Sequence, residues 1–422
     1  MIAKLKQIDY SKLLLIFLYL QPILDILYGV SFNYLKISIS INTIVRFLFM
    51  LIAIVYLLLQ KKNKIIKIPI GLILFYLALF SINVIARKDN IVLFYELKNM
   101  LQLFFFPICL LLFINIKDKI NIKDRHFFYL NLIYLFFIFV PDILGLGFSS
   151  YSEYKKGFIG WFYSSNSVGT IITILAPLSI YYLVNKKKYF QLIVYVLFIT
   201  YLFLSLGTKA PILGLGVIGS LLLLYAFIHL LKTKKYKYII ISIPILILFA
   251  IAAVFLTPKT AAYKNLKMHL ELFEIYTAKD AIKSEVFWDE IVFSQRFMFL
   301  DVTKDNYKKS DVPTKLLGLG FVENYNQENE NRKTIEIDYL DIFYRSGIVG
   351  TIIYLISIII AMMNIIKSKI IINYNNYSIF ISVVLAFVLA FFCGHVLTSP
   401  AVSIIISYLL INVDLKEKKT LK

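Results

Sequence analysis

The stretch LQLFFFPICLLLFINI at residues 101–116 decides the fold class. It carries no charged side chain, and with its flanks it reaches the roughly 20 residues that one helix needs to cross the apolar core of a membrane. Similar runs begin near Leu13, Ile41, Ile68, Met100, Phe127, Val168, Phe190, Pro211, Tyr238, Ile348, Ile379 and Leu397. The sequence therefore predicts an all-α, polytopic membrane protein of about twelve transmembrane helices.

The composition agrees with a membrane protein, and the positions of the cysteines exclude disulfides and cysteine-based metal sites. Of the 422 residues, 60% are hydrophobic and 17% are charged, a balance that lies outside that of soluble globular domains. The two cysteines, Cys109 and Cys393, both sit in apolar runs. We therefore expect neither a disulfide framework nor a cysteine-based metal site.

A net charge of +20 would suit a nucleic-acid-binding protein, but the positions of the charges exclude that class. Twelve helices place both termini on one side of the membrane. Basic residues gather on that side, at both termini and in the loops Lys61–Lys67, Lys117–Arg125, Lys186–Lys188, Lys232–Lys237 and Lys367–Lys369. Short cytoplasmic loops collect Lys and Arg in this way, and such loops attract anionic lipids. We expect a multi-pass plasma-membrane protein with both termini cytoplasmic, in contact with membrane lipids and not with nucleic acid.

The expected helices divide the chain into three regions. Residues 1–256 hold the first nine helices, residues 257–345 form a long extracellular loop, and residues 346–422 hold the last three helices and a cytoplasmic tail. The pattern inside the loop predicts a helix over Tyr263–Tyr276, a helix over Glu285–Val302 and a turn-rich stretch over Ser310–Gly320. Loops of this length usually carry function.

Basic side chains stand at the expected outer boundary, where the charge bias of membrane proteins does not favour them. Lys155 and Lys156 precede one span, and Lys209 lies in a tight link between two others. Arg296 lies inside the long loop, and its guanidinium suits bidentate contact with a phosphate. Two alternatives stay open: the paired lysines reach from a helix end toward water, and Arg296 pairs with Asp301 or Glu290.

Two carboxylates, Glu336 and Asp338, come just before the tenth expected span. An ionised carboxylate at the boundary of membrane and water can act as general base for an incoming hydroxyl. The alternative is that one of them caps the start of the helix. For His395, near the outer end of another span, we favour a packing role over that of ligand or base.

Inside the membrane, Asp25 and Arg46 lie at similar depths in the first two expected spans. Buried ions of opposite sign are usually paired, so we predict a structural ion pair. Glycine-rich phosphate loops, zinc-binding helix motifs and Ser/His/Asp signatures do not occur in the sequence.

Taken together, several short motifs resemble those of the O-antigen ligase and polymerase family. These are Lys155-Lys156-Gly157-Phe158 leading to Ser165-Asn166, then Gly207-Thr208-Lys209-Ala210, then Arg296 followed by Leu316-Leu317-Gly318-Leu319-Gly320, and finally acidic residues before Ser346-Gly347-Ile348-Val349-Gly350. The resemblance implies a membrane glycosyltransferase that takes a glycan from a polyprenyl-diphosphate-linked oligosaccharide donor on the outer face and passes it to an acceptor glycan. It implies neither metal nor cofactor.

The resemblance also implies roles for particular residues. Lys155 or Lys156, Lys209 and Arg296 match positions that hold the diphosphate, although the family more often has Arg where this chain has Lys209. Glu336 stands where related ligases have His, so the resemblance favours a polymerase of a surface polysaccharide over a ligase. Two alternatives stay open: a ligase-like transferase with a different acceptor, and a lipid-linked glycan transporter.

Overall fold

A computed structural model describes residues 9–36, 40–60, 64–87, 92–150, 156–220, 237–322, 334–367 and 374–413. These residues form helices and connecting loops, and the β pairing among them is an isolated bridge between Ser149 and Phe158. The prediction of an all-α fold is confirmed for this part of the chain.

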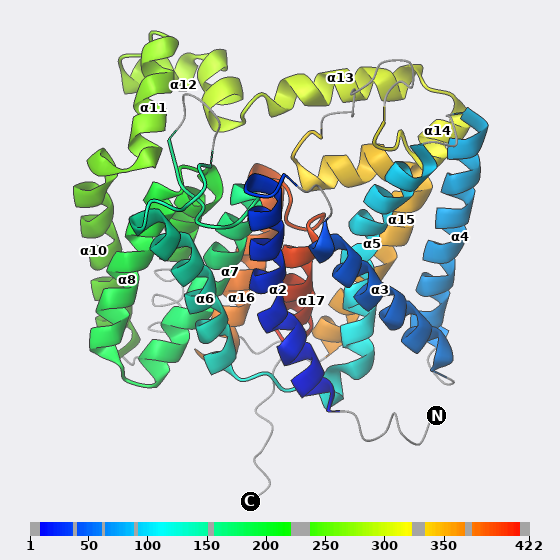
Figure 1. Ribbon diagram of the computed structural model, residues 1–422, viewed down its shortest axis with the longest axis horizontal. Coiled ribbons are helices and arrows are strands. Elements are labelled where there is room, and N and C mark those ends of the chain that lie inside the picture. Colours follow the sequence, from blue (N-terminus) through cyan, green and yellow to red (C-terminus); the bar gives the residue numbers. More distant parts are fainter. Residues whose placement is uncertain are drawn as a thin grey trace, which may run out of the picture. The chain divides into compact units, whose positions relative to one another are not determined.

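Seven helices of the described residues are long and apolar enough to cross a membrane. They are α2 (Tyr10–Asn33), α3 (Ile41–Leu59), α4 (Lys64–Arg87), α5 (Leu93–Ile116), α6 (Asp124–Ile143), α7 (Ser165–Asn185) and α15 (Asp338–Lys367), labelled in Figure 1. An eighth span results if α10 (Lys237–Leu256) and α11 (Ala261–Leu272), which meet at a 60° bend, count as one. The chain is thus a multi-pass membrane protein.

The predicted number of twelve spans is not confirmed. Over the described residues, four of the expected runs form shorter apolar helices of 10–17 residues. They are α8 (Tyr189–Ser205), Lys209–Ser220, α17 (Pro400–Ile411) and the part of α16 (Tyr374–Phe392) that begins at Tyr377. Pro400 begins α17, as its fixed φ angle favours at a helix start. The apolar run of residues 379–413 is therefore two short helices, as the sequence predicts.

The chain divides into two compact units. Unit 1 comprises residues 1–42, 118–281 and 377–389, and unit 2 comprises residues 43–117, 282–376 and 390–422. In unit 1, α6 packs against α7 and α2, and α8 packs against α10. In unit 2, α5 packs against α4, α15 and α17, and its fully buried Phe104, Phe105 and Phe106 form the centre of that core.

The expected extracellular loop is mostly helical. After α11 it contains α12 (Ala278–Lys283), a turn of π-helix (Phe287–Val292), α13 (Arg296–Lys309) and α14 (Val312–Leu317). The second predicted helix, Glu285–Val302, is wrong in its bounds because the left-handed residues Ser294 and Gln295 interrupt it. The stretch predicted as turns, Ser310–Gly320, contains α14, which Asp311 caps by accepting a hydrogen bond from the backbone of Thr314.

Helix α15 breaks at Gly347, whose φ of 65° is open to glycine and strained for other residues. The segment Leu316–Gly320 crosses the helix at this break. The N–H of Leu319 donates to the carbonyl of Tyr344 at 2.9 Å, and the N–H of Gly320 donates to the carbonyl of Arg345 at 3.2 Å. A Cβ on Gly347 would lie 2.6 Å from the carbonyl oxygen of Leu316. The glycines of the segment Leu316–Gly320 and Gly347 of α15 therefore let the two backbones cross in close contact. This contact fixes the first part of α15.

Candidate active site

Glu336 lies in the loop that leads into α15, and its carboxylate faces two basic groups of unit 2. Its Oε2 is 3.1 Å from Nη2 of Arg296, and its Oε1 is 3.9 Å from Nε2 of His395. The side chain of Glu336 keeps 29% of its surface exposed, whereas that of Arg296 keeps 5%. A partly open carboxylate thus sits between a buried guanidinium and an imidazole.

Arg296 is the first residue of α13 and is held by the end of α16. Its Nη1 donates to the carbonyl of Phe392, and its Nη2 donates to the carbonyl of Cys393 at 3.1 Å. Its Nε is buried and has no hydrogen-bond partner among the described residues. The pairing with Asp301 or Glu290 that the sequence left open does not form, because the guanidinium is turned toward Glu336 and Glu290 instead accepts from Gln295.

Asp338 is buried at the first position of α15 and binds the loop between α16 and α17. Its Oδ1 accepts from the N–H of His395 at 2.7 Å and from the hydroxyl of Thr398 at 3.0 Å. Its Oδ2 accepts from the N–H of Val396 at 2.7 Å and of Leu397 at 2.6 Å. Four short hydrogen bonds to one carboxylate fix the loop that carries His395.

A second carboxylate fixes the loop that carries Glu336. Asp341 accepts hydrogen bonds from the N–H of Ile335 at 3.0 Å and of Glu336 at 2.8 Å. Its Oδ1 also lies 3.7 Å from Nε of the fully buried Arg345. The acidic residues at the start of α15 therefore act on two different loops.

Left-handed backbone conformations are concentrated at this site. Ser294 and Gln295 precede Arg296, and Glu336 and His395 themselves have φ angles of 62° and 55°. Such conformations are costly for residues other than glycine, and they persist where the surrounding contacts over-determine them. The neighbouring Gly394 has a φ of 63°, and a Cβ there would overlap the backbone of Glu336. The two loops are thus pressed together with no room for a side chain between them.

The site favours the charged forms of both Glu336 and His395. Burial by itself raises the pKa of Glu336, but the adjacent His395 and Arg296 outweigh burial and lower that pKa from 4.5 to about 2. Burial lowers the pKa of His395, but Glu336, Asp338 and Asp341 outweigh burial and raise it above 6.5. The carboxylate and the imidazole therefore stabilise each other as an ion pair near neutral pH.

The predicted basic residues of unit 1 form a second group. Lys155 lies outside the described residues, and the backbone of Lys156 forms two hydrogen bonds of 2.7 Å with the side-chain amide of Asn265 on α11. A Cβ on Gly207 would lie 3.0 Å from the amide nitrogen of Asn265. The segment of Lys156 and the link that carries Lys209 therefore lie side by side, against the first helix of the long loop.

The structure thus brings Arg296, Glu336 and Asp338 together in unit 2, and it brings the segments of Lys156 and Lys209 together in unit 1. Asp25 of unit 1 accepts a hydrogen bond from Asn42 at 3.1 Å, and Arg46 of unit 2 is buried. The predicted ion pair between Asp25 and Arg46 stays a prediction.

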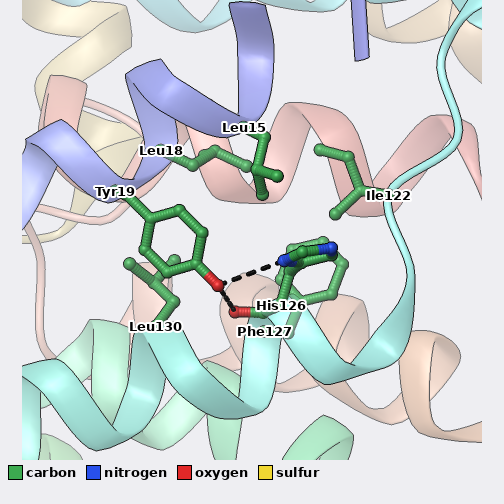
Figure 2. Close-up of a pocket in the computed structure, with 7 residues that line it drawn as sticks. All are labelled: Leu15, Leu18, Tyr19, Ile122, His126, Phe127 and Leu130. Atoms are coloured by element: carbon green, nitrogen blue, oxygen red, sulfur yellow. Dashed lines mark hydrogen bonds between the residues drawn. The ribbon is translucent and has the colours of Figure 1, made fainter. Parts of the chain in front are cut away.

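A small pocket lies elsewhere in unit 1, between α2 and α6. Figure 2 shows its lining of Leu15, Leu18, Tyr19, Ile122, His126, Phe127 and Leu130. The Tyr19 hydroxyl lies 3.2 Å from both Nδ1 and the carbonyl oxygen of His126. These side chains leave no room between them for a water molecule, whereas small-molecule sites usually hold roughly 300–1,000 Å³. We therefore assign it to helix packing.

Among the residues that the structure describes, no group of three or more His, Cys, Asp or Glu side chains is arranged to hold a metal ion. The sequence matches the family described as O-antigen ligase like membrane protein, over residues 7–286 and 278–417. The chain belongs to this family. Comparisons with curated proteins and with solved structures each found no match.

Membership in the O-antigen-ligase-like family confirms the resemblance seen in the sequence. It places the chain among membrane proteins that process glycans as ligases or polymerases. Two buried charged residues of this family member were not predicted from its sequence to form contacts. Glu96 on α5 is fully buried and accepts from the N–H of Phe321 at 2.7 Å and of Val322 at 3.0 Å, and Arg345 donates to the carbonyl of Gly320 at 3.0 Å.

A charge inside an apolar run is the signal that could have identified Glu96 and Arg345, because buried ions usually have partners. His395 was predicted to be a packing residue. Its side chain is instead 36% exposed and faces Glu336, and no sequence signal connects residues so far apart.

Proposed function

We propose that this protein is a polymerase of a surface polysaccharide. It transfers a glycan from a polyprenyl-diphosphate-linked donor to a hydroxyl of an acceptor glycan on the outer face of the plasma membrane. The observation that carries the proposal is the contact of 3.1 Å between the buried guanidinium of Arg296 and the partly exposed carboxylate of Glu336. In an O-antigen-ligase-like chain, these groups suit the two charges that such a transfer creates.

The first charge develops on the leaving diphosphate. Direct displacement at the anomeric carbon breaks the bond to the diphosphate oxygen, and cations already in place stabilise that negative charge more in the transition state than in the ground state. We assign this role to Arg296, and we keep the prediction from the sequence that Lys209 and Lys155 or Lys156 share it. Nη2 of Arg296 uses both of its hydrogens on Glu336 and Cys393, and Nη1 uses one on Phe392, so the buried Nε and the second hydrogen of Nη1 remain for a phosphate oxygen.

The second charge is the proton that the acceptor hydroxyl must lose. We place this step at the pair of Glu336 and His395, where a partly exposed carboxylate faces an imidazole. Asp338, the other carboxylate predicted for this role, is buried and accepts four hydrogen bonds from the loop before α17. It therefore suits a positioning role. Single displacement inverts the configuration at the anomeric carbon.

The carboxylate at Glu336 also supports a polymerase over a ligase, because related ligases have His at this position. The family description names ligases, so a ligase-like transferase to a different acceptor is the second candidate. The two differ in product. A polymerase joins repeat units to one another and gives a ladder, whereas a ligase moves one glycan to a chemically different acceptor.

The test uses the full-length protein in lipid nanodiscs with lipid-linked glycans extracted from the native cells. We expect a glycan ladder on a gel, and we expect Arg296→Ala and Lys209→Ala each to lower its rate of formation by about 10²–10³-fold. Lys304→Ala, an exposed cation on the same helix as Arg296, is the matched control and should behave like wild type. A single new band would favour the ligase. Transfer of donor across the membrane without a new glycosidic bond would contradict both.

A further inference from the structure

His395 and Glu336 form a carboxylate–imidazole pair at the open side of the site. The Nε2 atom of His395 faces Oε1 of Glu336 at 3.9 Å, and both side chains keep about a third of their surface exposed. In many enzymes a carboxylate holds one ring nitrogen of a histidine, which leaves the other nitrogen to take a proton from the attacking group. The pair therefore contains two groups that could accept the proton, and their environments differ.

The carboxylate is the weaker acceptor of the two. One oxygen of Glu336 is bound by Arg296 and the other faces His395. A general base works best when its pKa lies near the working pH. The pKa of Glu336 is lowered to about 2, after these cations outweigh its burial. A carboxylate held in this way suits orientation and charge stabilisation better than proton capture.

The imidazole is both free and firmly placed. Its Nε2 faces Glu336, which leaves Nδ1 for an incoming group, and the backbone N–H of His395 is bound to Asp338 at 2.7 Å. Gly394 packs directly on the backbone of Glu336, and His395 and Glu336 both adopt left-handed φ angles. Contacts that fix two strained loops against each other also fix the direction of the ring.

We infer that His395 takes the proton from the acceptor hydroxyl and that Glu336 is the positioning residue for its ring. The inference rests on the proposed function and names the atom that acts in it. A lone pair of the acceptor oxygen forms the bond to the anomeric carbon, and the bond from that carbon to the diphosphate oxygen breaks. Its electron pair leaves with the diphosphate. The hydroxyl proton moves to Nδ1 of His395, while the hydrogen on Nε2 points to Glu336, and water later removes the proton.

This assignment gives the enzyme a characteristic dependence on pH. The charged groups that act on His395 are Glu336 in the loop before α15, and Asp338 and Asp341 on α15 itself, while Arg296 on α13 acts on Glu336. The acidic groups prevail and hold the pKa of His395 above 6.5. Only the neutral ring accepts a proton, so the rate should rise with pH through the pKa of His395.

The decisive experiment compares pH–rate profiles of wild type, Glu336→Gln and His395→Gly, with extracted lipid-linked glycans as donor. Wild type should show a rise in rate through the pKa of His395. Glu336→Gln should keep this rise but move it to lower pH, because the ring loses a negative neighbour. His395→Gly should lower the rate by about 10²–10⁴-fold and lose the rise.

Rescue with free imidazole separates catalysis from folding. Glycine suits the left-handed backbone at position 395 and keeps the N–H that binds Asp338, so His395→Gly should fold and leave space for a ring. Added imidazole should restore part of its rate, with a rise through the pKa of imidazole. It should not rescue Glu336→Gln. The control His126→Gln, at the histidine beside Tyr19 in unit 1, should keep the wild-type profile.

Two results would overturn the inference. In the first, the rate of Glu336→Gln no longer rises with pH, whereas the rate of His395→Gly still does. That result would make Glu336 itself the base. The other is a folded His395→Gly variant with a near-normal rate. Failure of the proposed function is different, because wild type would then form no new glycosidic bond at any pH.

Discussion

The guanidinium of Arg296 lies 3.1 Å from the carboxylate of Glu336, although 40 residues separate them in the sequence. The same guanidinium binds the carbonyls of Phe392 and Cys393. One buried cation therefore joins the long loop, the entrance of α15 and the end of α16. Its removal should affect both the reaction and the stability of the site.

Arg296→Ala should lower the thermal stability of the protein as well as its activity. The substitution leaves two carbonyls and a carboxylate without their donor, and each unsatisfied buried group costs about 1–3 kcal/mol. Thermal unfolding in detergent measures this loss, with Lys304→Ala as the control on the same helix. Arg296→Lys should recover part of the stability but less of the rate, because an ammonium cannot reach the same acceptors together. An Arg296→Ala protein as stable as wild type would contradict the contacts described.

Asp338→Asn should destabilise the protein rather than only inactivate it. An amide can keep one acceptor oxygen, but its NH₂ group would face either the N–H groups of Val396 and Leu397 or the N–H of His395 and the hydroxyl of Thr398. We expect a loss of roughly 2–4 kcal/mol from the broken charge-assisted hydrogen bonds. Unfolding temperature and rate should be measured on the same preparation. A variant that keeps its unfolding temperature and loses turnover would instead make Asp338 a catalytic base.

Gly394→Ala tests the close contact between the loops of Glu336 and His395. Its φ of 63° is unfavourable for alanine, and the added Cβ would meet the backbone of Glu336. We expect a lower unfolding temperature and a loss of most activity. Gly71→Ala is the matched control, because a Cβ there meets nothing within 4 Å. In the helix interior it should be neutral or stabilise by about 0.5–1 kcal/mol. Equal behaviour of the two variants would refute the close contact.

The ion pair of Glu336 and His395 should give the stability a dependence on pH. The pKa of Glu336 is lowered from 4.5 to about 2 in the folded protein, so its contribution is complete above pH 4.5 and is lost as the pH falls toward 2. The pKa of His395 is raised above 6.5, so its contribution is complete below pH 6.5 and is lost as the pH rises through the folded value.

The pair should therefore stabilise most between pH 4.5 and 6.5. Unfolding temperatures of wild type and Glu336→Gln across the pH range measure this contribution as their difference. We expect the difference to be largest inside that window and to shrink on both sides. A difference that stays constant with pH would mean that the two groups do not interact.

The orientation in the membrane stays a prediction that cysteine labelling can check. Lys308 lies on α13 of the expected extracellular loop, and Lys187 lies between α7 and α8 on the expected inner side. Both are exposed, whereas the natural Cys109 and Cys393 are buried. In intact cells an impermeant thiol reagent should label Lys308→Cys and leave Lys187→Cys unlabelled until the membrane is opened. The reverse pattern would invert the topology.

The amino-acid sequence by itself determined the class of this protein. Preference for lipid is a property of local composition, so a run such as residues 101–116 predicts a membrane helix without knowledge of its neighbours. A charge at the end of such a run stands out for the same reason, so Glu336 was predicted as a site residue, whereas Arg296 was predicted from its place in the long loop. The motifs also identified the family correctly. The number of twelve spans is not confirmed, because the apolar runs near Phe190 and Leu397 form helices of 17 and 12 residues.

Only the tertiary structure decided which charges meet and what each one does. Asp338 and His395 are 57 residues apart, and their hydrogen bond depends on how α15 and the loop before α17 pack together. From sequence, Asp338 and Glu336 were equivalent carboxylates two positions apart. In the fold one is buried under four hydrogen bonds, while the other lies partly open between two cations. Burial and partners set the chemistry of an ionisable group, and both come from segments distant in the chain.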